Sequence, residues 1–207
     1  MLAEQPIRAF LDALASDSPT PGGGGAAAVS GALGAALVAM TANLTVGRKN
    51  YEAVDSEMRA LISRAEDLRE QLTQLIDADA AAFDAVSAAY KLPRGSDDEK
   101  KTRTAAIQAA LKAASDPPFR IMEAARQVLD ISLPAAQRGN ANLVSDAAVA
   151  AYLAQAAIQG ARLNVEINLR GIKDEQFVLD GRARIARAFD GASDITAAVE
   201  LAVADRG

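Results

Sequence analysis

Apolar residues recur every three or four positions along most of the chain, which is the spacing of one face of an α-helix. The longest such pattern runs from about 54 to 92 and ends at Pro93 and Gly95. The alternation of apolar and polar residues that is typical of β-strands is missing. The sequence therefore predicts an all-α fold in a single domain, residues 1–207. The expected helices cover about 4–16, 25–46, 54–92, 97–115, 119–137, 147–170 and 174–206, with a break in the last near 190–194.

Two of these segments, 25–46 and 147–170, are rich in alanine and almost free of charge. In the first, Gly31 and Gly34 belong to a small-residue face that lets a neighbouring backbone come close. The first segment is also about long enough to span a membrane. Its polar residues, among them Ser30 and Thr41, favour a buried helix in a bundle over a membrane span. We therefore expect a helical bundle with these two helices buried at its centre, amphipathic helices around them, and no membrane partner.

The composition restricts the chemistry that this protein can perform. None of the 207 residues is cysteine or histidine, so disulfides, thiolate catalysis and the commonest metal ligands are excluded, and we expect no metal. Any proton transfer must use Asp, Glu, Lys or Tyr. The net charge of −5 argues against nucleic acid as a partner. The first residues do not resemble a signal peptide, and we expect a cytoplasmic protein.

A glycine-rich stretch precedes the first apolar helix. Pro19 and Pro21 exclude helix there, and Gly22, Gly23, Gly24 and Gly25 follow directly. Bare backbone leading into a helix N-terminus offers unpaired N–H groups and a positive dipole end to a ligand, which makes Pro21, Gly22, Gly23 and Gly24 candidate binding residues. The alternative is a tight turn whose glycines only permit close packing. A phosphate-binding P-loop is excluded, because no Gly-Lys-Ser/Thr follows.

Asp79 interrupts the apolar stripe of the longest helix. It lies seven residues after Leu72 and four before Phe83, so its side chain points the same way as theirs. A carboxylate facing an apolar seam is costly unless it is paired, and burial raises its pKa. In a chain without histidine, Asp79 is therefore the leading candidate for a general acid or base. The alternative is a buried Asp that caps a helix or pairs with a basic residue.

Asn164 and Asn168 lie four residues apart, on one face of the second alanine-rich helix. Their amides are suited to the donor and acceptor edge of a heterocycle, but they could equally bond each other or the backbone of the glycine-rich turn.

Two further polar clusters flank the apolar helices. Arg48 and Lys49 follow the first of them, where they either hold an anionic ligand tail or form a solvated charge pair, and Tyr51 could stack on such a ligand. Asn140 and Asp146 lie near the start of the second, where helix capping is the alternative to ligand binding.

Several of these residues belong to motifs that occur in one order. The motifs are Pro19–Gly25, Asn43–Tyr51, Asp77–Asp79 with Ala82–Phe83, Lys91–Pro93, Gly139–Asn140, Ser145–Asp146 and Asn164–Leu169. In this respect the chain resembles the cyclodeaminase/cyclohydrolase family of one-carbon folate metabolism. The resemblance implies an all-helical homodimer with a tetrahydrofolate derivative as substrate and no further cofactor. It also implies that Asp79 is the catalytic carboxylate and that Phe83 contacts the substrate.

The activity that the resemblance implies is hydrolysis of 5,10-methenyltetrahydrofolate to 10-formyltetrahydrofolate. Asp79 would take a proton from the attacking water, Arg48 and Lys49 would meet the glutamate tail, and Asn164 and Asn168 would orient the pterin or its bridging nitrogens. Two alternatives stay open. One is a cyclodeaminase that releases ammonia from 5-formiminotetrahydrofolate, although a free-standing chain favours hydrolysis. The other is a non-catalytic helical dimerisation module, against which the inward-facing Asp79 argues.

Overall fold

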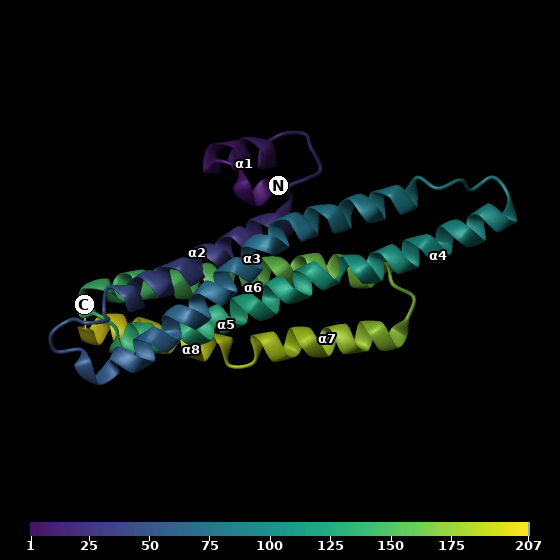
Figure 1. Cartoon of the computed structure of the whole chain (residues 1–207). Coiled ribbons are helices and arrows are strands. Elements are labelled where there is room, and N and C mark those ends of the chain that lie inside the picture. Colours follow the sequence, from purple (N-terminus) through teal and green to yellow (C-terminus); the bar gives the residue numbers. More distant parts are fainter. Residues whose placement is uncertain (207) are drawn as a thin grey trace.

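The computed structural model describes residues 1–206, and every regular element in that range is helical, as the sequence predicted (Figure 1). Three short 3-10 helices, Leu2–Glu4, Glu52–Val54 and Ala141–Leu143, precede or connect the longer ones. The α-helices are α1 (Ile7–Leu14), α2 (Gly23–Asn43), α3 (Asp55–Tyr90), α4 (Asp97–Ala114), α5 (Asp116–Arg138), α6 (Val144–Gly171), α7 (Glu175–Phe189) and α8 (Ala192–Arg206).

Helices α2 and α6 pack against each other at the centre of the bundle, with α3 and α5 beside them. Their contact is close because the facing residues are small. A Cβ on Gly34 would lie 2.9 Å from the Ala150 carbonyl oxygen, and the Ser30 hydroxyl donates a hydrogen bond of 2.8 Å to the Leu153 carbonyl. The prediction of two central alanine-rich helices is confirmed. One face of α2 is nevertheless uncovered, since Leu33 is half exposed.

Both apolar helices have the composition of membrane spans. By length and hydropathy alone, α2 and the segment 141–171 are suited to cross a membrane. In the fold, 56 % and 44 % of their most apolar windows are buried inside the bundle. Packing in the protein core therefore accounts for much of this apolar character.

Helix α3 belongs to the core in its first two thirds and leaves it in the last third. Its predicted apolar stripe is buried through Leu72, Leu75 and Ile76, whereas Phe83 and Tyr90 are about half exposed. The end of α3 and the start of α4 form a hairpin that projects beyond the other helices (Figure 1). Helix α4 begins with a capping box, in which the Ser96 side chain accepts from the Glu99 N–H and the Glu99 carboxylate accepts from the Ser96 N–H.

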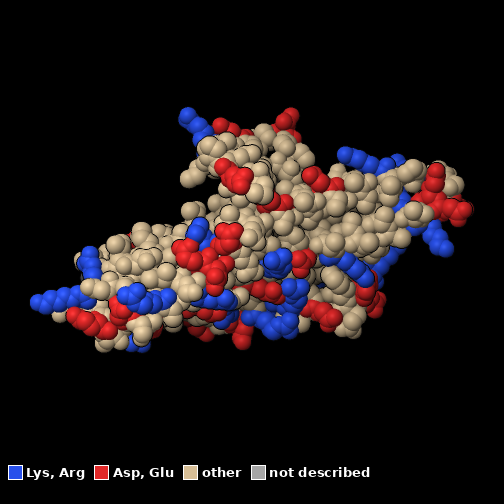
Figure 2. All heavy atoms as spheres, in the orientation of Figure 1, with Lys and Arg blue, Asp and Glu red and all other residues tan. Residues whose placement is uncertain are grey.

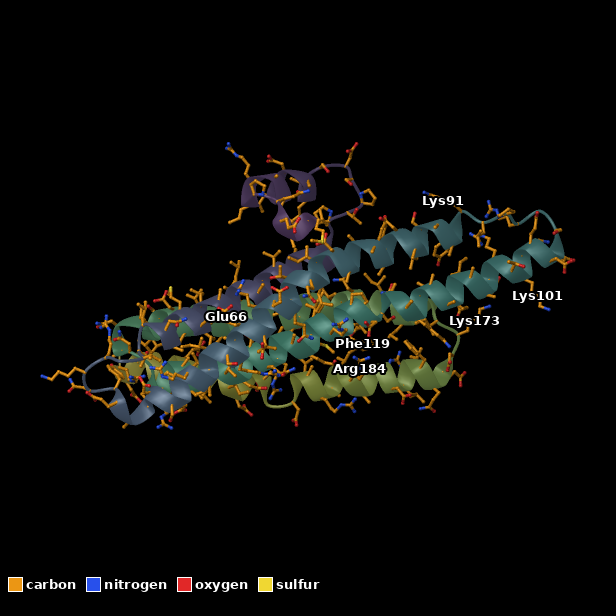
Figure 3. All side chains as sticks on the ribbon, in the orientation of Figure 1. Glu66, Lys91, Lys101, Phe119, Lys173 and Arg184 are labelled. Carbon is orange, nitrogen blue, oxygen red and sulfur yellow. The ribbon has the colours of Figure 1, made fainter. Side chains whose placement is uncertain are left out.

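Two arginines link helix α7 to α5, because Arg126 of α5 donates to the Ala188 carbonyl of α7 and Arg184 of α7 contacts α5. The Arg184 guanidinium stacks over the Phe119 ring at 4.0 Å from its centroid and forms two hydrogen bonds, of 2.7 and 3.0 Å, with the Glu123 carboxylate (Figure 3). These contacts hold α7 against α5.

Helix α1 stands away from the bundle (Figure 1). It buries Phe10 but leaves Ile7 and Leu11 largely exposed. The N-terminal arm is tied to α3, because the Leu2 N–H donates a hydrogen bond of 2.6 Å to the Asp77 carboxylate. The chain then returns through Pro19 to the first turn of α2.

Candidate functional site

A cavity of about 450 Å³ lies where the first turn of α2, the last third of α3, the end of α4 and the C-terminal half of α6 meet. Its wall is more apolar than polar, as is usual for a site that takes a flat organic ligand. Tyr90 and Leu111, which the sequence analysis did not single out, contribute to the apolar part. The candidate residues that the structure brings together here are Gly22, Gly23, Gly24, Asp79, Phe83, Asn164 and Asn168.

The glycines form the first turn of α2, not a loop before it. Helix α2 begins at Gly23, two residues earlier than expected, and Gly22 is its extended N-cap residue. None of these glycines has a positive φ, so what glycine provides here is space. A Cβ on Gly24 would lie 2.2 Å from a carboxylate oxygen of Asp79, a separation that no real contact has. Pro21, another candidate, is buried behind this turn and does not line the cavity.

Asp79 is half buried, with its carboxylate against the backbone at the N-terminus of α2. Burial raises the pKa of this carboxyl above its ordinary value of 3.8, while a hydrogen bond from the Gly25 N–H acts in the opposite direction. Among residues 1–206, no basic side chain forms an ion pair with Asp79. The alternative of a buried ion pair is therefore not what the structure shows, whereas the hydrogen bond from the Gly25 N–H, in the first turn of α2, is the capping contact that the other alternative predicted. A partly desolvated, unpaired carboxyl is suited to take and release a proton.

Asn164 and Asn168 project from the same face of α6 into the cavity wall, as their spacing predicted. They do not bond each other or the glycine turn. Asn164 Nδ2 donates to the Gly160 carbonyl at 2.9 Å, and Asn168 Nδ2 donates to the Ala114 carbonyl at 2.9 Å. Both amides are thereby held by backbone carbonyls.

The remaining candidates lie at the other end of α2. A helix of 21 residues is about 30 Å long, which separates its first turn from the segment that follows its last. Within one chain, these residues therefore do not line the cavity around Asp79, and their role in binding stays a prediction. They are Arg48, Lys49, Tyr51, Asn140 and Asp146.

Two of these five form local hydrogen bonds, and for Asn140 this is the helix capping that the sequence analysis gave as the alternative. The Tyr51 hydroxyl accepts a hydrogen bond of 2.9 Å from the Ala141 N–H. Asn140 donates through Nδ2 to the Leu44 carbonyl at 3.2 Å and accepts from the Asn142 N–H at 3.2 Å. Arg48 and Lys49 are exposed, and Asp146 lies in the first turn of α6. The sequence could not reveal this separation, since helix periodicity says nothing about which ends meet.

A metal centre finds no support in the geometry. In the part of the chain that the structure describes, no three acidic side chains come together in a way that would hold a metal ion.

Comparison with known proteins gives one consistent result. The sequence profile of the formiminotransferase-cyclodeaminase family matches residues 6–187. The chain is 48 % identical over 177 residues to a methenyltetrahydrofolate cyclohydrolase from Methylorubrum extorquens, covering 86 % of this chain and 85 % of that protein. It is 40 % identical to the formimidoyltransferase-cyclodeaminase of Rattus norvegicus over 89 % of this chain, but spans only 34 % of that protein.

The fold is similar to a solved structure as well. The crystal structure of formiminotetrahydrofolate cyclodeaminase from Thermotoga maritima superposes with a TM-score of 0.88 at 32 % identity, over 99 % of this chain and 98 % of that one.

Proposed function

Because this chain belongs to the formiminotransferase-cyclodeaminase family, we propose that it hydrolyses 5,10-methenyltetrahydrofolate to 10-formyltetrahydrofolate in the cavity around Asp79. The observation that carries this proposal is the Asp79 carboxyl, which forms no ion pair and lies with a raised pKa against bare backbone in a mostly apolar cavity. We expect the reaction to take place in the cytoplasm, without nucleic acid or membrane partners.

The substrate supplies its own electrophile. Its methenyl carbon lies between N5 and N10 in a cationic amidinium, which water can attack without metal activation. Asp79 takes a proton from the attacking water as the oxygen–carbon bond forms. It then returns that proton to N5 as the carbon–N5 bond breaks, and the hydroxyl proton of the intermediate passes to solvent water as the formyl carbonyl forms. The negative Asp79 also stabilises the cationic substrate.

The first turn of α2 is suited to hold the attacking oxygen. The first helical N–H that bonds within the backbone is that of Ala26, which donates to the Gly22 carbonyl at 3.0 Å. The N–H groups of Gly23 and Gly24 come before it and have no helical partner, as in any first turn. Both residues line the cavity beside Asp79. They therefore offer donors to a hydroxyl or oxyanion at the reacting carbon.

The apolar wall on α3 supports binding of a flat ring. Phe83 and Tyr90 lie on the same face of α3, about two helical turns apart. Both line the cavity and are about half exposed. Aromatic rings of this kind stack on conjugated ligands such as the pterin or the aminobenzoyl group.

A second activity is supported by the resemblance to the Thermotoga maritima cyclodeaminase, with its TM-score of 0.88. Release of ammonia from 5-formiminotetrahydrofolate would use the same carboxyl, now donating a proton to the leaving amine. The higher identity to the cyclohydrolase favours hydrolysis as the main activity.

We propose that the protein acts as a homodimer through the uncovered face of α2 and α6. Helix α2 carries no charged residue from Gly23 to Asn43. Leu33 on α2 and Val149, Tyr152 and Leu163 on α6 are each about half exposed. In Figure 2, charged atoms gather along the lower edge and at the tip of the α3–α4 hairpin, while the surface over the left part of α2 is mostly uncharged. Apart from Glu200, which accepts a hydrogen bond from the Tyr152 hydroxyl, these residues form an uncharged face, and such a face is complementary to a second copy of itself.

A two-fold axis through the middle of α2 would also complete the site. Such an axis exchanges the two ends of the helix, so the Arg48–Tyr51 segment of one protomer comes to the Asp79 end of the other. The cavity of a single chain is lined by no lysine or arginine among the described residues, although the substrate has a carboxylate tail. In this dimer, Arg48 and Lys49 keep the tail-binding role that the sequence suggested.

The proposal is tested by following the near-UV absorbance of methenyltetrahydrofolate with the wild-type protein, Asp79→Asn and Asp84→Asn. Asp84 is exposed on the same helix and serves as the matched control. We expect wild-type and Asp84→Asn to turn over alike and Asp79→Asn to lose about 10²–10⁴-fold in kcat. Full turnover by a folded Asp79→Asn protein would exclude the role of this carboxyl. Turnover of the formimino substrate alone would assign the second activity instead.

A further inference from the structure

Tyr90 forms the outer end of the cavity wall on α3, and its hydroxyl does not fix its ring there. It continues the row of cavity residues on that helix, because it lies seven residues after Phe83 and eleven after Asp79. Tyr90 is the last residue of α3 and is about half exposed. Within residues 1–206, its hydroxyl forms no hydrogen bond. The direction of the ring therefore depends on what lies against it.

One side chain of the next helix lies over this ring. The Arg103 guanidinium of α4 is 5.6 Å from the centroid of the Tyr90 ring. The same group donates two hydrogen bonds to the Tyr90 carbonyl, one of 3.2 Å from Nε and one of 2.9 Å from Nη2. That carbonyl lies in the last turn of α3, where the helix offers it no N–H partner. Arg103 thus holds both the backbone and the ring of one residue.

Arg103 is not engaged by any acidic side chain. Among residues 1–206 it forms no ion pair, although it is partly buried. The acids near the start of α4 have other partners, since Asp97 pairs with Lys100 and Glu99 closes the capping box. A planar guanidinium can donate two hydrogen bonds in a fixed geometry and stack on an aromatic face, which an ammonium group cannot do. The contact with Tyr90 therefore makes use of what distinguishes arginine from lysine.

We propose that Arg103 is a positioning residue, which holds the Tyr90 ring in the cavity wall and thereby strengthens binding of a flat part of the substrate. Because the guanidinium lies over one face of the ring, the other face and the edge are left for a ligand. Tyr90 lies about 16 Å from Asp79 along the helix axis, so its ring acts on binding and not on proton transfer. The inference rests on the proposed function only for the nature of the flat part, which would be the pterin or the aminobenzoyl group.

The position of the ring can be measured without any ligand. The chain has three tyrosines, so an NMR spectrum of isotope-labelled tyrosine contains few ring signals. We expect Arg103→Met to shift the Tyr90 signals and to leave those of Tyr51 and Tyr152 in place. Lys101→Met is the matched control, at an exposed position two residues earlier on α4, and should move none of them (Figure 3). Unchanged Tyr90 signals in a folded Arg103→Met protein would overturn the inference.

The effect on the substrate is tested by a cycle of variants. Arg103→Met should raise the KM for methenyltetrahydrofolate about 3- to 10-fold with little change in kcat, because it weakens a binding contact that is remote from the reaction. In a Tyr90→Phe protein the same substitution should have the same effect, since the ring is still present. In a Tyr90→Ala protein it should add almost nothing to KM, because the ring through which Arg103 acts is already gone.

The cycle separates this role from simple capping of α3. The two hydrogen bonds go to the backbone, so they survive Tyr90→Ala, and their loss should lower the melting temperature equally with and without the ring. If Arg103→Met raises KM by the same factor in the Tyr90→Ala protein, Arg103 acts as a cap or as a charge, and the inference is overturned. A fall in kcat at unchanged KM would overturn it as well. Arg103→Lys keeps the charge and provides a milder variant, which should shift the Tyr90 signals and raise KM in the same direction.

The two proposals fail separately. If wild type does not turn over methenyltetrahydrofolate, the folate assignment fails, whereas the NMR measurement still decides whether Arg103 positions the ring. If wild type is active and Arg103→Met changes neither the Tyr90 signals nor KM, only the role of Arg103 fails.

Discussion

The carboxylate of Asp79 occupies the space that a side chain at Gly24 would need. A Cβ there would meet Asp79 Oδ1 at 2.2 Å and its Cγ and Oδ2 at 2.5 Å. Two residues 55 positions apart in the sequence are therefore coupled, because the glycine lets the acid lie directly against the start of a helix. This contact places the proposed proton-transfer group next to the free N–H groups of α2.

Gly24→Ala should abolish most activity while leaving the fold intact. The new methyl group displaces the Asp79 carboxylate, whereas alanine is favourable in a helix by up to about 1 kcal/mol relative to glycine. We expect kcat to fall by about 10²-fold or more, because displacement removes most of the acid–base contribution. Circular dichroism and the melting temperature should stay close to wild type.

Gly25→Ala is the comparison for this effect. A Cβ at that position meets Pro21 and Ile76 at 3.6 and 3.9 Å, which is ordinary contact. The loss of kcat should therefore be specific to Gly24→Ala. If both variants lose activity equally, helix geometry and not carboxylate displacement is responsible.

The raised pKa of Asp79 has a consequence for stability. A carboxyl whose pKa is higher in the folded state contributes stability that is complete below the unfolded value, near 3.8, and is lost as pH rises through the folded value. Asp79→Asn removes this loss. We expect its melting temperature to exceed that of wild type at pH 7 and to approach it as the pH falls towards 4.

Thermal unfolding of wild type and Asp79→Asn at a series of pH values measures this difference in melting temperature. The other titrating groups are the same in both proteins, so their contributions cancel. Asp84→Asn, at an exposed position, should show no such trend. A melting temperature for Asp79→Asn below that of wild type at pH 7 would mean that the charged carboxylate stabilises the fold.

Gly34→Ala should destabilise the bundle without touching the site. Its Cβ would lie 2.9 Å from the Ala150 carbonyl oxygen and 3.3 Å from a Val128 methyl group, and backbone cannot move aside as a side-chain tip can. Overpacking of this kind costs about 1–3 kcal/mol. For a chain of this size, that lowers the melting temperature by about 2–4 °C per kcal/mol. Gly23→Ala, whose nearest neighbour is 3.7 Å away, should melt like wild type.

The proposed dimer predicts that charge on the face formed by α2 and α6 separates the subunits. Leu33→Glu buries a carboxylate in the proposed interface, so we expect a monomer by light scattering and loss of turnover. Leu179→Glu is the matched substitution, at an exposed leucine on α7 outside this face, and should remain dimeric and active. A wild-type monomer with full activity would refute the dimer.

Mixed dimers test whether the site is shared. Asp79→Asn and the double variant Arg48→Ala/Lys49→Ala each damage both sites of their own homodimer. When the two are mixed and exchange subunits, one site of each heterodimer regains a complete set of residues, so about a quarter of wild-type activity should return at low substrate concentration. If no activity returns although heterodimers form, each subunit carries its own complete site.

The sequence by itself determined the helices and singled out Asp79. Periodic apolar residues predicted α2 to α6 with ends within a few residues, because a helix buries one face and Pro, Gly and capping residues end it locally. Asp79 could be found for the same reason, since a charged residue in register with Leu72 and Phe83 lies on the helix face that carries the apolar stripe.

Only the tertiary structure decided which helix ends meet. It brought the start of α2 to Asp79, Asn164 and Asn168, and it left Arg48 and Lys49 about 30 Å away. It also showed that Gly24 is needed for space and that both asparagine amides are held by backbone carbonyls. Helix periodicity fixes which face of a helix is buried, but the neighbour of each end depends on how the helices pack.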